Sequence, residues 1–289
     1  MFIKTMLFCA MCARGDAKRD AGLSTPAGIT RFDAIPYGPD RANTLDVYYP
    51  AGTNGKLPTI VNVHGGGYAY GSTKTYQFYC MDLALRGFAV VSFNYRLAPR
   101  YKFPTPLLDT NAVLQWVCAN AHLYHLDPGN LFLIGDSAGA QIASQYAALV
   151  TAPAYATIMG IAPPPIRLAG LGLNCGMYDM ERSLELADSS RFLKENYFGQ
   201  DLSLWGEKLD VLAHITAAYP PTYLMSAPGD FLVGNCQPMA ALLQARGVPC
   251  AYKIYGDDST GHVFHINIRS PLARQANDDQ INFLKQYIR

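Results

Sequence analysis

Short apolar runs alternate with segments of helical periodicity along most of this chain. An alternation of this kind is typical of a mostly parallel sheet with helices on both of its faces. The sequence therefore predicts an α/β fold. The runs expected to form strands are 31–35, 45–49, 59–63, 88–95, 131–134, 168–173, 222–225 and 251–255.

Segments between and after these runs are predicted helices, and one of them, between the last two strands, is marked by Met239, Leu242 and Leu243. The first covers 76–86 and is expected to end at Gly87, because glycine commonly stops a helix. In the second, which follows Pro104 and Pro106, residues recur at a spacing of four and predict a stripe that faces the core. These residues are Leu108, Ala112 and Trp116. In the closing helix, apolar residues repeat at helical spacing, namely Ile281, Leu284 and Ile288.

Two segments depart from the alternation, namely 1–27 and 178–219. The second carries aromatic residues among polar ones: Phe192, Tyr197, Phe198 and Trp205. The chain has 289 residues, of which 50% are hydrophobic, and this is enough to bury one large core. We therefore expect a single domain over 1–289 with these two segments as additions to it.

Charge and cysteine content narrow the class of protein. A formal net charge of +1 gives no electrostatic reason to expect nucleic acid or an acidic membrane surface as the partner, so a small neutral molecule is expected. The seven cysteines are scattered and odd in number, which favours a reducing cytoplasm over a disulfide-bonded secreted fold. Cys9 and Cys12 form a C-x-x-C without a second pair, so neither a metal nor a redox role is expected.

The N-terminus has a faint likeness to a signal peptide, with Lys4 followed by an apolar run over 6–13. The run is short and passes directly into charged residues without a small-residue cleavage site, so a helix of the mature protein is expected. No other stretch approaches the roughly 18 apolar residues of a membrane span.

Ser137 lies in the sequence Gly-Asp-Ser-Ala-Gly at 135–139, after the apolar run 131–134 and before a stretch of small residues. This order predicts a strand, a sharp turn and a helix, with the serine at the turn. Bulky flanking residues would collide with the strand and helix, and Gly135 and Gly139 avoid this. Ser137 is therefore the candidate nucleophile.

A second motif, His-Gly-Gly-Gly at 64–67, follows the predicted strand 59–63. Consecutive glycines are costly in a folded chain, and they are useful where backbone N–H groups must approach a ligand closely. The ligand expected here is the oxyanion of a tetrahedral intermediate, bound by the N–H groups of Gly66, Gly67 and Ala138.

These motifs, with Asn-Tyr-Arg-Leu-Ala-Pro at 94–99, resemble the hormone-sensitive-lipase-like branch of the α/β-hydrolase esterases. The resemblance covers nearly the whole chain and implies an α/β-hydrolase fold, a cap built from about 1–27 and 178–219, and a brace role for His64. Arg100 departs from the family pattern, which more often has an acidic residue there.

In this fold an acid and then a histidine follow the serine on later strand-end loops. Asp230 follows the predicted strand 222–225 and is the favoured acid. Asp201 and Asp210 lack a preceding strand, whereas Asp257 and Asp258 lie close to the histidine in sequence.

His262 lies on the loop after the predicted strand 251–255 and is the favoured base. His265 follows three residues later, at the start of an apolar segment, and remains an alternative. The remaining histidines lack a strand-end context and are expected to be structural: His122, His125 and His214.

These residues predict acyl transfer to water. Imidazole accepts the serine proton during attack, the carboxylate holds the imidazole, and no cofactor or metal is expected. The resemblance implies a carboxylesterase that prefers small, short-acyl esters. The alternatives are an esterase that acts on sugar or xylan acetyl esters, an amidase or peptidase, and a non-catalytic homologue that binds a ligand. The sequence leaves open whether the protein forms a homodimer and whether Tyr68 or Tyr70 contacts the substrate.

Overall fold

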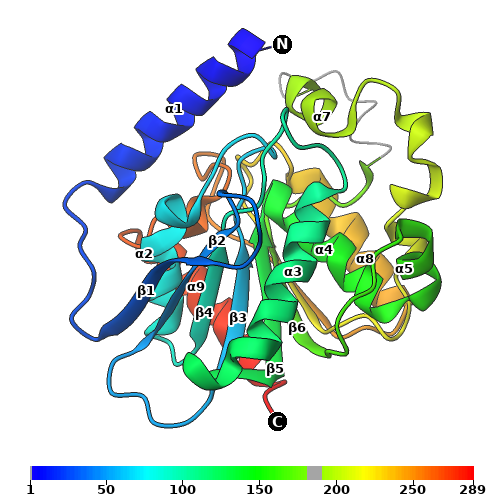
Figure 1. The fold of residues 1–289 in the computed structure, drawn as a ribbon. Helices are drawn as coiled ribbons and strands as arrows, with labels where there is room; N and C mark the ends of the chain where they lie inside the picture. Colours follow the sequence, from blue (N-terminus) through cyan, green and yellow to red (C-terminus); the bar gives the residue numbers. More distant parts are fainter. Residues whose placement is uncertain (1, 181–190) are drawn as a thin grey trace.

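A computed structural model describes residues 2–180 and 191–289, and within them one eight-stranded sheet runs through the molecule (Figure 1). The β1-β2 and β2-β4 pairs are antiparallel and every later pair is parallel, which confirms the predicted α/β class. In spatial order the strands are β1 (Ile29–Pro36), β2 (Thr44–Pro50), β4 (Ala89–Phe93), β3 (Leu57–Val63), β5 (Leu126–Asp136), β6 (Leu168–Asn174), β7 (Thr222–Ser226) and β8 (Cys250–Ile254).

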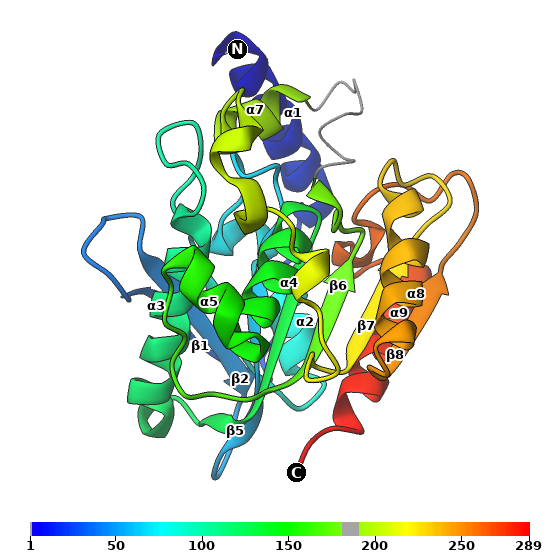
Figure 2. The same cartoon turned by 90° about the vertical axis from the view of Figure 1, so that its right-hand side faces the viewer.

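Helices cover both faces of this sheet, as predicted. Successive strand residues point to opposite sides, and apolar side chains on both sides pack against helices. Ile60 and Phe132 pack in one cluster with α2 (Thr73–Ala84) and α9 (Pro271–Lys285). Their neighbours Val61 and Leu133 pack in a larger cluster on the other face. That face carries α3 (Thr105–Asn120), α4 (Ala138–Thr151), α5 (Pro153–Met159) and α8 (Cys236–Ala245). Figure 2 shows α4 and α5 in front of the sheet.

The predicted core stripe of α3 was wrong. Leu108 is 43% exposed, whereas Leu107, Leu114 and Val117 are fully buried. A strict spacing of four drifts around a helix of 3.6 residues per turn, and the sheet contacts the row that includes Leu107 and Leu114 instead. The predicted closing stripe is also too long, because α9 ends at Lys285 and Ile288 lies beyond it.

The first predicted helix begins earlier than expected. Ser72 and Thr75 form a reciprocal capping box at the start of α2, so the helix begins at Thr73 rather than at 76.

The N-terminal segment is helical, as predicted: α1 spans Phe2–Asp20 and lies beside α7 (Arg191–Phe198) above the carboxyl ends of the strands (Figures 1 and 2). The Asn196 amide donates a hydrogen bond to Thr5 Oγ1 at 2.8 Å. Within the described ranges, no helix is both long and apolar enough to span a membrane. Part of the second predicted cap segment, 181–190, lies outside the described residues.

Candidate active site

Ser137 occupies the turn between β5 and α4, so the strand, turn and helix predicted around it are present. Its φ of 52° and ψ of −120° are strained for a residue with a side chain. A Cβ at Gly135 would lie 2.4 Å from the Gly139 carbonyl oxygen, and one at Gly139 would lie 2.0 Å from that of Val63. Both flanking positions therefore require glycine.

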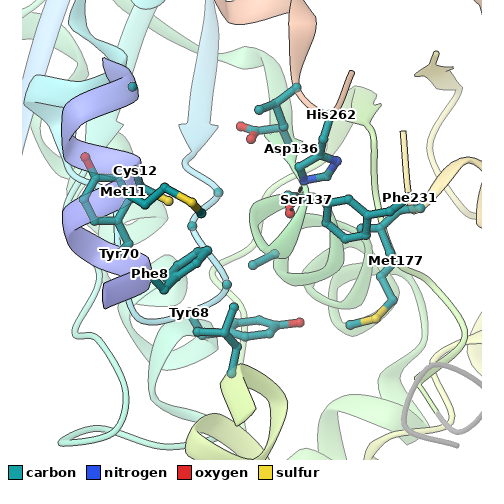
Figure 3. A pocket seen from close by; sticks show the side chains of 18 of the residues that line it. Phe8, Met11, Cys12, Tyr68, Tyr70, Asp136, Ser137, Met177, Phe231 and His262 are labelled. Carbon is teal, nitrogen blue, oxygen red and sulfur yellow. Dashed lines mark hydrogen bonds between the residues drawn. The ribbon is translucent and has the colours of Figure 1, made fainter. Parts of the chain in front are cut away.

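The structure brings Asp230 and His262 to Ser137 from separate loops after β7 and β8. His262 Nε2 lies 2.8 Å from Ser137 Oγ, and His262 Nδ1 lies 2.7 Å from Asp230 Oδ1. Figure 3 shows the imidazole directly above the serine hydroxyl. These parallel strands end at the same edge of the sheet, which is why residues 125 positions apart in the sequence are in contact.

Asp230 is buried and is held by further donors. Ser226 Oγ donates to its Oδ2 at 2.6 Å, and the Leu232 N–H donates to Oδ1 at 2.9 Å. Burial by itself would raise the pKa of Asp230, but the hydrogen bonds from His262, Ser226 and Leu232 outweigh it and lower the pKa. The carboxylate is thus held ionised beside the imidazole.

The alternative acids accept hydrogen bonds within their own turns. Asp201 accepts the Ser203 N–H, Asp210 accepts the Ala213 N–H, and Asp257 accepts the Ser259 N–H.

Among the described residues, the histidine that contacts the serine hydroxyl is His262. His265 is fully buried, and burial lowers its pKa to about 3, so its ring is neutral. His125 Nδ1 lies 2.7 Å from the Gly55 carbonyl oxygen, and His214 stacks on Tyr155.

The glycine loop follows β3 and lies beside Ser137. Gly66 and Gly67 have φ values of +109° and +58°, and a Cβ at Gly66 would lie 2.2 Å from the Tyr70 carbonyl oxygen. Among the described residues, the N–H groups of Gly66 and Gly67 have no acceptor. Ala138 is the first residue of α4, so its N–H has no partner within the helix. These three donors all line the same cavity.

The His64 side chain contacts this loop and packs beneath it in the core. Its ring stacks on Tyr95 with 4.1 Å between centroids, and its Nδ1 lies 2.7 Å from the Gly65 carbonyl oxygen. Burial lowers the pKa of His64 to about 4, so the ring remains neutral.

A cavity of about 930 Å³ opens over Ser137. On one side its wall comes from α1, with Phe8 and Met11, and on the other side from Met177 and Phe231 (Figure 3). The polar residues Asp16 and Tyr70 also line it, and Tyr70 OH donates to Asp16 Oδ2 at 2.7 Å. The cavity therefore offers mainly apolar surface on both sides of the serine.

Tyr68 lies in the cavity wall and is only 2% exposed. It stacks on Tyr197 at 4.0 Å between centroids and donates a hydrogen bond to Gln141. Tyr68 therefore packs the wall, whereas Tyr70 ties α1 to the glycine loop.

Four residues of the site were not identified from the sequence: Ser226, Cys175, Phe231 and Asp136. The Cys175 thiol belongs to a group with Asp230 and His262 whose ligand atoms lie within 4.8 Å of one another. The ring of Phe231 lies 4.3 Å from that of His262. Asp136 and Phe231 carried a signal, since each is next to a predicted site residue in the sequence, and of these four residues only these two line the cavity.

Asp136 is fully buried and accepts a hydrogen bond from Tyr76 OH at 2.7 Å. Burial raises the pKa of Asp136 to about 7.

Comparison with known proteins agrees with this geometry. A family model described as alpha/beta hydrolase fold matches residues 60–266. Carboxylesterase NlhH of Mycobacterium tuberculosis is 30% identical over 217 residues, which are 70% of this chain and 65% of that protein. An acetyl esterase of Salmonella choleraesuis is 27% identical over 280 residues, 89% of this chain and 80% of that protein.

Among solved structures, inhibited esterase B from Lactobacillus rhamnosis superposes with a TM-score of 0.90 at 25% identity, covering 99% of this chain and 95% of that one. The chain belongs to the hormone-sensitive-lipase-like family of α/β-hydrolase-fold esterases.

Proposed function

We propose that this esterase hydrolyses small carboxylic esters through an acyl-enzyme intermediate on Ser137. The observation that carries the proposal is the continuous hydrogen-bond chain from Ser137 Oγ through His262 to Asp230, at 2.8 and 2.7 Å, beneath an apolar cavity.

His262 is the general base. As Ser137 Oγ attacks the ester carbonyl carbon, Nε2 takes the hydroxyl proton and then gives it to the departing alkoxide. Asp230 accepts the Nδ1 hydrogen bond, which fixes the tautomer and stabilises the imidazolium. A water molecule then attacks the acyl-enzyme by the same proton transfers, and this releases the acid and restores the serine.

The backbone N–H groups of Gly66, Gly67 and Ala138 form the oxyanion hole. Because the first two have no acceptor among the described residues, they are available to a developing negative charge. Removing one such donor typically costs on the order of hundredfold in rate.

The cavity supports an apolar ester as substrate. Among its polar wall residues, Tyr70 and Asp16 are hydrogen-bonded to each other, so a sugar hydroxyl would have to compete with that hydrogen bond. Curated relatives include a carboxylesterase and an acetyl esterase, which supports a short acyl group with the larger part of the cavity left for the alcohol.

We assign 1–27 and 178–219 as the cap of a single domain. The support is that α1 and α7 contribute Phe8, Met11 and Leu193 to the cavity wall. If a folded variant lacking 1–27 keeps the same ester preference, the N-terminal part of this cap assignment is wrong.

The seven cysteine thiols are unpaired, which supports a reducing compartment such as the cytoplasm.

Hydrolysis of 4-nitrophenyl esters from acetyl to decanoyl tests the activity, with Ser137→Ala as the matched control. We expect turnover that falls with acyl length and is lost in the variant. Turnover that persists in Ser137→Ala, or a folded native protein that cleaves amides but no ester, contradicts the proposal.

A further inference from the structure

The outward face of α1 carries large apolar side chains that no described part of the chain covers. Ile3, Met6, Leu7 and Met11 are 72%, 58%, 66% and 67% exposed. Their positions follow the i, i+3, i+4, i+8 spacing of one helix face. On an ordinary surface helix this stripe faces the core, so α1 is oriented the opposite way.

The orientation of α1 is fixed by contacts on its inward face. Thr5 is buried and accepts the Asn196 hydrogen bond, and the ring of Phe8 packs edge-on against Phe192. Near the end of α1, Arg19 donates to the Thr75 carbonyl oxygen at 2.6 Å. Anchored along its length, the helix is held with its apolar stripe toward water.

The exposed charge on α1 is positive. Among the described residues Lys4, Arg14 and Lys18 make no ion pair, whereas Asp16 and Asp20 are both paired with Arg19. A net charge of +1 for the whole chain thus conceals a cationic helix. Apolar residues combined with lysine and arginine are the composition of helices that lie in a lipid–water interface.

The apolar stripe is continuous with the entrance of the catalytic cavity. Leu7 and Met11 belong both to the stripe and to the cavity wall, and Lys4 lies beside them. Across the opening, Phe231 is 67% exposed and also lines the cavity. An apolar rim thus extends from the surface of α1 toward Ser137.

We propose that α1 docks the cavity entrance onto an anionic lipid surface, with the stripe in the acyl boundary and the basic side chains on the headgroups. The consequence for substrate supply rests on the proposed esterase function: an ester dissolved in the lipid enters the cavity without crossing water. The docking itself does not depend on that function.

A second copy of this chain fits the same face less well. A two-fold contact through α1 would bring Lys4 and Arg14 of one copy near those of the other, and it would cover the entrance that Leu7 and Met11 line. Like charges facing each other oppose such a dimer, whereas anionic headgroups complement them.

Vesicle sedimentation of the full chain tests the docking. We expect binding to phosphatidylcholine vesicles that contain phosphatidylglycerol, weakening with added salt and lost in the Ile3→Asp/Met6→Asp double variant. Neither residue lines the cavity, so turnover of dissolved 4-nitrophenyl acetate should stay unchanged while turnover of a vesicle-borne ester falls. Arg14→Ala and Lys18→Ala should each weaken binding about fivefold.

Leu123→Asp is the matched control. Leu123 is 57% exposed and lies just before β5, at the amino ends of the parallel strands and so at the end of the sheet opposite to α1. It should bind as the native chain does. Absence of sedimentation, equal binding by the double variant, or a concentration-dependent dimer that the double variant abolishes overturns the proposal. Vesicle binding without ester turnover refutes only the proposed function.

Discussion

Replacing Ser226 with alanine removes one donor from the proposed catalytic acid and leaves the other contacts of the site in place. Ser226 is fully buried, and its hydroxyl lies 2.6 Å from Asp230 Oδ2. No cavity residue is changed, since Ser226 does not line the substrate space. Ser226→Ala therefore tests whether the charge on Asp230 is held by this network.

The expected loss of stability follows from the charge on the acceptor. A hydrogen bond to an ionised group contributes about 1.5–3 kcal/mol. The folded-state pKa of Asp230 is lowered, so its contribution is present above the unfolded-state pKa and is lost as the pH falls through the folded-state value. We expect the variant to lose about 2 kcal/mol at pH 7, with the deficit shrinking in acid as Asp230 becomes protonated.

The same substitution should alter the pH dependence of catalysis. Without the hydrogen bond from Ser226, the Asp230 carboxylate retains more negative charge and stabilises the imidazolium more strongly. The acid limb of the kcat/KM profile therefore moves to higher pH. Poorer positioning of Asp230 lowers kcat/KM at the plateau by about tenfold or more. Urea unfolding at several pH values and a kcat/KM profile with 4-nitrophenyl acetate measure both effects.

Ser144→Ala is the matched control. Ser144 is 1% exposed, but its hydroxyl donates to the neutral Gln141 carbonyl oxygen within α4, at 3.0 Å. We expect less than about 1 kcal/mol of destabilisation and no movement of the acid limb. If both variants lose the same stability and leave the profile in place, the role assigned to Ser226 is refuted.

Four further predictions concern the same site. Burial raises the pKa of Asp136 to about 7, so its ionisation opposes folding, and the contribution of Asp136 to native stability should fall by about 4 kcal/mol in total as the pH rises from about 4 to 7. Asp136→Asn should abolish that contribution. Urea unfolding gives the difference in free energy of unfolding between the variant and the native chain, and the same difference at pH 5 and at pH 8 would count against the prediction. Asp230→Asn should lower kcat about 10⁴-fold with little change in KM, measured on 4-nitrophenyl acetate. Gly139→Ala should cost about 3 kcal/mol in urea unfolding, because its Cβ would press on the Val63 carbonyl oxygen, whereas Gly234→Ala, with no atom within 4 Å, should cost under about 1 kcal/mol. Activity of the native chain should rise with pH as the base loses its proton, and a rate independent of pH from about 5 to 8 would argue against His262.

The sheet and the order of the site residues could be predicted because both depend on local signals. Each of these site residues follows a strand that appears in the sequence as an apolar run, and the carboxyl ends of parallel strands lie at the same end of the sheet. Ser137, Asp230 and His262 each follow such a run, so their proximity follows from topology without knowledge of side-chain packing.

Contacts between side chains within the core could not be predicted in the same way. Ser226 is one of several serines near strand ends, and nothing in its neighbourhood distinguishes it before β7 places its hydroxyl against Asp230. Cys175 has the same difficulty, since its position beside Asp230 and His262 depends on the turn after β6. The role of such residues depends on contact distances that only the packed structure defines.

The orientation of α1 shows a different limit. A period of three to four residues establishes that a helix has an apolar side, but it does not say what that side contacts. In α3 the stripe expected to face the sheet is displaced around the helix. In α1 the apolar stripe is exposed, and only its Leu7 and Met11 edge borders the catalytic cavity. The partner of a helix face is decided by the contacts on its other side: here Thr5, Phe8 and Arg19 fix α1 from within, so the exposed stripe is available to a partner outside the chain.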